Sequence, residues 1–267
     1  MLHMGRWTFI VLLLFILTGC HSTPQHPERA GIALSFDDRF FSDWMALRPL
    51  LNQYQAKVTF YVNCPDSLTN EEVSILKTLQ QEGHEIGFHG TIHGISTEMI
   101  QNLGVEGYLA TEIRPGLSYL QQAGFHPTSY AHPGGNHNAR VDSVLEASGF
   151  RILRDVALAE RSYKGFRLYH LSPQWLPQIY YDFVPQRSVD ALLFDTSANL
   201  SVAELRSALV RAKMRGKAVL LFGHQPFFSV PKPEQYGFDV QVLRQMLQTA
   251  DSLNLKFYRM SDLPVIQ

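Results

Sequence analysis

Short apolar runs alternate with longer amphipathic segments along most of this chain. The apolar runs have the length and composition of buried β-strands. They predict strands at residues 31–36, 57–63, 85–88, 129–131, 150–153, 167–171, 218–222 and 256–258. The segments between them carry apolar residues at helical spacing. They predict helices at residues 43–54, 70–81, 111–123, 140–147, 202–215 and 240–253.

The alternation of strand and helix indicates an α/β fold with a mainly parallel sheet. So many strand–helix units in one chain favour a closed or nearly closed (β/α) barrel over a small open sheet. Residues 157–200 interrupt the alternation, and they are rich in Tyr, Pro and Gln. We interpret this stretch as an insertion that lines a groove.

The first residues have the composition of a targeting segment. Arg6 supplies a positive charge, and residues 7–17 are apolar apart from Thr8, a run too short to span a bilayer. The run ends in residues 17–20, Leu-Thr-Gly-Cys, which resemble a bacterial lipobox and imply cleavage before Cys20 and lipidation of Cys20. The alternative is a plain signal peptide with a coincidental cysteine.

These features predict a lipoprotein signal peptide at residues 1–19, a lipidated tether at 20–30 and one folded domain at 31–267. The lipid would anchor the protein to a membrane of the bacterial cell envelope. His21, rather than Asp, follows the cysteine. In a Gram-negative host this favours the outer membrane, with the domain facing the periplasm.

The overall charge and the number of cysteines exclude some kinds of protein. The net charge of the 267 residues is -1, which argues against a nucleic-acid binder because such proteins usually present a basic face. Apart from Cys20 the chain has only Cys64, so it forms no internal disulfide. We interpret Cys64 as a buried apolar side chain rather than a nucleophile.

Polar clusters follow several predicted strands, where α/β barrels carry their active sites. Asp37 and Asp38 follow the first strand, and His89 and His93 follow the third. Two carboxylates and a His-x-x-x-His pair would supply three metal ligands and one spare base, as metal-assisted hydrolysis requires. The alternative for the aspartates is a helix cap beside a solvated acid. His84 is an alternative ligand, although its position before a strand favours a structural role.

Two further clusters follow later strands. Residues 133–135 are Pro133, Gly134 and Gly135, and glycines allow backbone amides to approach a ligand closely, although an ordinary turn is the simpler interpretation. His224 follows the apolar run at 218–222, and an imidazole has a pKa suited to proton transfer near neutrality.

The order of these clusters resembles the polysaccharide deacetylase family, also called the NodB-homology or carbohydrate esterase 4 group, over about residues 31–262. Residues 35–38, Ser-Phe-Asp-Asp, resemble the family's Thr-Phe-Asp-Asp motif, and residues 83–93 resemble its Gly-His-Glu-Ile-Gly-x-His-x-x-x-His motif. Residues 131–135 resemble the Arg-x-Pro-x-Gly motif. Residues 221–224 resemble the closing strand that ends in the catalytic histidine.

The resemblance implies a distorted (β/α) barrel of the NodB-homology type, with a deacetylase-like catalytic domain at 31–267. It implies that Asp38, His89 and His93 bind a divalent metal, usually Zn²⁺. Asp37 would be the general base and His224 the general acid. We expect metal and backbone N–H groups near Gly134 and Gly135 to stabilise the oxyanion.

The chain departs from the family pattern in three places. Arg39 stands where the family usually has Gly, and Ala131 stands where many members have an Arg that orients the base. The family's later Asp/Trp motif has no clear counterpart; Asp155 and Trp175 are candidates for it. Arg154, after the fifth predicted strand, is a substitute partner for Asp37.

The leading hypothesis is a metal-dependent hydrolase that removes N-acetyl groups from amino sugars of a cell-envelope or extracellular polysaccharide. Its partners would be an acetylated glycan substrate and a membrane, with no nucleic acid. One alternative is an O-deacetylase or deformylase at the same metal site. Another is a catalytically impaired glycan-binding lipoprotein of the same fold, which the absence of Arg at position 131 motivates.

Overall fold

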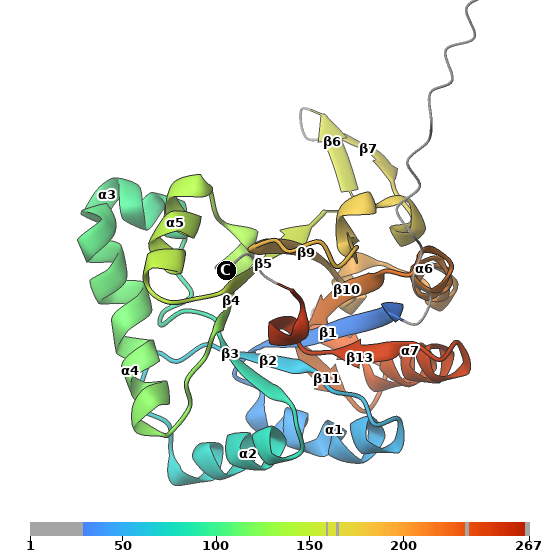
Figure 1. The fold of residues 1–267 in the computed structure, drawn as a ribbon, viewed down its shortest axis with the longest axis horizontal. Coiled ribbons are helices and arrows are strands. Elements are labelled where there is room, and N and C mark those ends of the chain that lie inside the picture. The colour runs from blue at the N-terminus through green and yellow to red at the C-terminus, as the bar shows by residue number, and fades with distance from the viewer. Residues whose placement is uncertain (1–28, 159, 164–165, 233–234, 265–267) are drawn as a thin grey trace, which may run out of the picture.

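The computed structural model describes residues 29–158, 160–163, 166–232 and 235–264 (Figure 1). The predicted signal peptide and Cys20 lie outside the described residues. Among the helices of the described part of the chain, none is long and apolar enough to cross a membrane.

Seven parallel strands close into a barrel, as the sequence predicts (Figure 1). The sheet closes because β1 pairs with both β2 and β10, each in parallel register. In spatial order the barrel strands are β1 (Gly31–Asp38), β2 (Thr59–Val62), β3 (Glu85–Phe88), β4 (Ser129–Ala131), β5 (Ile152–Ala157), β9 (Ser188–Leu193) and β10 (Ala218–Gly223).

Short strands extend the barrel or form small separate sheets. β13 (Lys256–Tyr258) pairs in parallel with the start of β1, and β8 (Tyr180–Tyr181) pairs antiparallel with β10. The two remaining pairs are β6 (Glu160–Tyr163) with β7 (Phe166–His170), and β11 (Gln225–Phe227) with β12 (Gly237–Asp239).

Helices surround the barrel (Figure 1). They are α1 (Phe41–Gln53), α2 (Asn70–Gln81), α3 (Ser96–Tyr108), α4 (Arg114–Gln122), α5 (Ala139–Ala147), α6 (Val202–Arg215) and α7 (Val240–Ser252). A π-helical segment, Leu109–Ile113, joins α3 to α4, so the helix predicted from residue 111 begins inside a longer helical stretch.

Helix α3 and the barrel strand β9 were not predicted from the sequence. Gly104 has a φ of 72° inside α3, and this break weakens the helical pattern. Asp190 interrupts the apolar run of β9. The strand predicted at 167–171 exists as β7, but it pairs with β6 outside the barrel. Residues 157–200 therefore contain both an inserted hairpin and a barrel strand.

Side-chain alternation divides the core into two clusters. The smaller cluster contains alternate residues of the barrel strands, including Ala33, Tyr61, Ala131 and Ile152, which meet in the barrel interior. The larger cluster lies between the strands and the helices.

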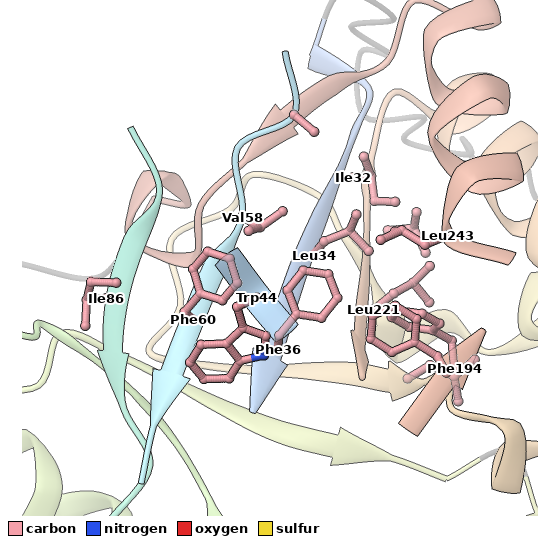
Figure 2. Packing of buried hydrophobic residues seen from close by; sticks show 14 of the residues in the cluster. Ile32, Leu34, Phe36, Trp44, Val58, Phe60, Ile86, Phe194, Leu221 and Leu243 are labelled. Carbon is pink, nitrogen blue, oxygen red and sulfur yellow. The ribbon is translucent and has the colours of Figure 1, made fainter. Parts of the chain in front are cut away.

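Phe36 belongs to the larger cluster and packs beside Trp44 and Phe60 (Figure 2). Its ring centroid lies 5.7 Å from that of Phe60 and 5.3 Å from that of Phe238. Because Phe36 faces the helices, the next side chain, Asp37, faces the barrel interior.

We expect Phe36→Ala to reduce the free energy of unfolding by about 3–5 kcal/mol, because it leaves a cavity among aromatic side chains. Urea denaturation measures the effect. The matched control is Phe228→Ala. Phe228 is 55% exposed, so its removal should change the free energy of unfolding little. Equal losses in the two variants would contradict the packing described for Phe36.

Candidate active site

The carboxyl ends of the barrel strands bring the predicted polar clusters together. Asp37 and Asp38 end β1, His89 follows β3, and His224 follows β10. Nε2 of His89 lies 3.9 Å from Oδ2 of Asp37, so the polar residues at the ends of β1 and β3 lie side by side. The predicted clusters therefore share one end of the barrel.

The three predicted metal ligands form a compact group. Nε2 of His89 lies 3.6 Å from Oδ1 of Asp38, and Nε2 of His93 lies 3.9 Å from the same oxygen. One potential ligand atom from each residue lies within 4.8 Å of the others. Two imidazole nitrogens and one carboxylate oxygen are a donor set that suits zinc.

His89 is held in the form that a metal requires. Its Nδ1 lies 2.9 Å from the carbonyl oxygen of Ala131, so the ring donates Nδ1–H there and leaves the Nε2 lone pair facing Asp38. Burial lowers the pKa of His89 to about 3, although the charge of Asp37 opposes this shift. The ring is therefore neutral near pH 7, and the residues fit a divalent cation.

Two of the predicted ligands have unusual backbone conformations. Asp38 has a φ of 82° and His93 a φ of 57°, a region that side chains other than glycine rarely adopt. Such conformations persist where the surrounding structure fixes them, and they concentrate at functional sites.

Glu112 holds the loop that carries His93. Its side-chain oxygens accept hydrogen bonds from the backbone N–H groups of Ile92 and Gly94, each at 3.1 Å. Burial raises the pKa of Glu112 to about 7, even though these hydrogen bonds oppose the shift. Glu112 lies in the π-helical segment, so sequence periodicity gave no signal for this role.

Asp37 forms a buried ion pair with Arg154, as the sequence analysis suggested. The Arg154 guanidinium donates to Oδ2 of Asp37 and lies over the rings of Tyr61 and Phe222. Burial alone would raise the pKa of Asp37, but the positive charge of Arg154 outweighs it, so the pKa is lowered. Among the described residues, Oδ1 of Asp37 has no hydrogen-bond partner. Asp37 is therefore an ionised carboxylate with one free oxygen.

His224 has a carboxylate partner that the sequence analysis missed. Its Nδ1 lies 2.6 Å from Oδ2 of Asp195, and its backbone N–H donates to Oδ1 of Asp195 at 3.0 Å. Burial alone would lower the pKa of His224, but Asp195 and the charge of Asp37 outweigh it and raise the pKa. Asp195 follows β9, so the available signal was an acid after the apolar residues 191–194.

Tyr236 covers the other side of the His224 ring. Its hydroxyl hydrogen-bonds to Nε2 of His224, and the two ring centroids are 4.0 Å apart. Tyr236 is nevertheless 51% exposed, and no sequence pattern singled it out.

Pro133, Gly134 and Gly135 form a single 3₁₀ turn after β4. Pro133 lies beside the loop that contains His89 and His93, since a Cβ on Gly90 would approach its Cγ to 3.4 Å. The Gly135 N–H already donates to the carbonyl of His132 at 3.0 Å. The oxyanion role expected of Gly135 therefore has no support in this geometry, and that of Gly134 stays a prediction.

The remaining candidates have structural roles. Cys64 is buried, and burial raises its thiol pKa to about 11, in agreement with an unreactive side chain. His84 is buried, and its Nδ1 accepts a hydrogen bond from the backbone N–H of Val58 at 3.2 Å. Arg39 forms ion pairs with Asp66 at 2.6 Å and Glu72 at 3.0 Å.

Comparison with known proteins supports the same fold. A family model described as polysaccharide deacetylase matches residues 25–153. No curated protein matches the sequence significantly.

Solved structures of deacetylases are similar over most of the chain, at sequence identities that indicate the fold alone. The chitin deacetylase of the fungal pathogen Colletotrichum lindemuthianum is 14% identical, with a TM-score of 0.56 over 88% of this chain and 87% of that one. A variant of the peptidoglycan deacetylase PdaC of Bacillus subtilis is 16% identical, with a TM-score of 0.53 over 89% and 91%. The peptidoglycan N-acetylglucosamine deacetylase of Eubacterium rectale is 14% identical, with a TM-score of 0.51 over 89% and 93%.

We expect Asp195→Asn to lower the pKa of His224, because a neutral amide replaces the carboxylate that stabilises the imidazolium. NMR titration of the His224 ring measures the shift directly. Asp251→Asn, at an exposed carboxylate in α7, should leave the His224 pKa unchanged. An unchanged His224 pKa in Asp195→Asn would show that Asp195 does not set it.

Proposed function

We propose that this chain is a member of the polysaccharide deacetylase family, whose model matches residues 25–153, and that it is a metal-dependent hydrolase that removes N-acetyl groups from amino sugars of a cell-envelope or extracellular polysaccharide. One observation carries the proposal. The compact group of Asp38, His89 and His93 lies beside a carboxylate, Asp37, that has one free oxygen.

The metal would be held by Asp38, His89 and His93. When bound, zinc supplies Lewis acidity that polarises an amide carbonyl and makes a water molecule easier to deprotonate. The neutral His89 ring and the strained backbone at Asp38 and His93 support this assignment.

Asp37 would act as the general base. Arg154 occupies Oδ2 and keeps the carboxylate ionised, while Oδ1 has no partner among the described residues. Oδ1 is therefore the atom that takes the proton from the attacking water. Arg154 also supplies, from β5, the arginine that position 131 lacks. This ion pair with Asp37 favours an active hydrolase over the alternative of an impaired glycan-binding protein.

His224 would act as the general acid. Asp195 holds its Nδ1 and favours the protonated ring, so Nε2 carries the proton that the departing amine needs. The Tyr236 hydroxyl contacts this same nitrogen, and it must give way to the leaving group.

The chemistry of the site and the similar structures support the proposed substrate class. An amine is a poor leaving group, so its departure benefits from the acid provided by His224. The similar structures include deacetylases of chitin and peptidoglycan, both polymers of N-acetylated amino sugars. A lipid anchor at Cys20 would place the domain in the bacterial cell envelope, at the outer membrane facing the periplasm.

We expect Asp37→Asn to retain zinc and to release acetate from N-acetylglucosamine oligomers about 10²–10⁴-fold more slowly, because the general base is lost. We expect Asp38→Asn to lose the active-site zinc and the activity together. Acetate release and zinc content, measured on the same samples, separate these two effects.

The exposed variant Asp251→Asn should behave like the wild type. Full activity in Asp37→Asn would contradict the role of Asp37. Acetate release from O-acetylated sugars alone would favour the O-deacetylase alternative, and formate release from an N-formylated sugar would favour the deformylase.

A further inference from the structure

A second group of histidines and aspartates lies next to the catalytic site but outside its machinery. It consists of His132, His137 and Asp142, whose potential ligand atoms lie within 4.8 Å of one another. Asp155 adjoins the group through His137. None of these residues takes part in the mechanism proposed above.

The pairing of β4 with β5 separates the two sites. Ala131 and Arg154 are register partners, and both serve the catalytic site, one through His89 and the other through Asp37. Because side chains alternate along strands, the following residues, His132 and Asp155, face away from the barrel interior. There His132 meets Asp142 in the first turn of α5, and Asp155 meets His137.

His132 lacks the partners that a buried imidazole normally has. Its side chain is fully buried, and neither ring nitrogen has a hydrogen-bond partner among the described residues. Nε2 lies 3.3 Å from Oδ1 of Asp142 but outside hydrogen-bonding geometry. An unpartnered nitrogen in a buried, polar setting is costly, and a cation would satisfy it.

A carboxylate orients the His137 ring, as carboxylates commonly orient histidines that bind metals. Its Nε2 lies 2.6 Å from Oδ2 of Asp155, and its Nδ1 lies 3.0 Å from Oδ1 of Asp142. If Nε2–H donates to Asp155, the Nδ1 lone pair faces the space beside Asp142. This carboxylate–histidine arrangement fixes the tautomer of metal ligands in proteins.

The charges of the group also call for a cation. Two carboxylates meet two imidazoles here, and within the described part of the chain no Lys or Arg forms an ion pair with Asp142 or Asp155. The side chains of His137 and Asp142 are 26% and 20% exposed, which gives a small ion a route from solvent. Two neutral imidazoles and two carboxylates would balance one divalent cation.

We propose that His132 Nε2, His137 Nδ1 and the Asp142 carboxylate form a second zinc site, with Asp155 orienting His137. Two nitrogen donors and one oxygen donor suit zinc better than the hard cations Mg²⁺ and Ca²⁺. The ion would tie the turn at 133–135 and the start of α5 to β4 and β5. It would thereby fix the strands that hold His89 and Asp37, without contacting the substrate.

The test counts zinc on the purified full-length chain, loaded with zinc, desalted and measured by elemental mass spectrometry. We expect about two zinc ions per chain in the wild type and about one in Asp38→Asn and in His137→Gln. The double variant should retain none. The matched control is His126→Gln, at an exposed histidine in the loop before β4, and it should retain both ions.

The outcomes separate this proposal from the proposed function. Zinc that persists in Asp38→Asn and disappears when His137→Gln is added supports the second site, even if the wild type binds a single ion. No zinc in Asp38→Asn, or equal zinc in His137→Gln and the wild type, would overturn it.

A second variant protects the test against misfolding of His137→Gln. Asp155→Asn leaves all three ligands in place and removes only the support of His137. Combined with Asp38→Asn, it should weaken zinc binding roughly 10–100-fold in a chelator competition. Unchanged affinity would contradict the role proposed for Asp155 in orienting His137 for zinc.

Discussion

The buried ion pair of Asp37 and Arg154 is the interaction on which the active site depends. It joins the end of β1 to β5 across the barrel interior, so it forms only when the sheet has closed. Breaking such a pair costs about 3–5 kcal/mol, because one charge is left buried without a partner. Arg154 lowers the pKa of Asp37. The ionised carboxylate therefore contributes fully to folding stability at pH values above the usual carboxyl pKa. This contribution is lost only as the pH falls through that lowered value.

Side-chain alternation along β4 and β5 then gives one strand pair two tasks. The backbone carbonyl of Ala131 fixes the ring of His89, and the inward-facing side chain of Arg154 holds Asp37. His132 and Asp155 face outward toward α5 and gather the second group of potential ligands. A shift of β4 against β5 would disturb both the active site and the second group of potential ligands. A cation bound on the outer face would oppose such a shift.

The polar residues at strand ends were predictable because each follows a short, strongly apolar run. Asp37, Asp38, His89 and His224 all met this condition, and the parallel barrel brings such positions together. Asp195 also follows apolar residues, 191–194, but Asp190 shortens this run and an inserted hairpin precedes β9, so the strand itself was not predicted. Tyr236 and Glu112 reach the site from segments without strand periodicity, so only the folded chain reveals them.

Barrel closure is proposed to assemble a zinc site from β1 and the loop after β3. Crystals of the zinc-loaded protein, with diffraction recorded above and below the zinc absorption edge, test it most directly. We expect an anomalous peak within bonding distance of Asp38, His89 and His93, about 2.0–2.2 Å from each ligand atom. Ordered density for these three side chains with no peak between them would contradict it.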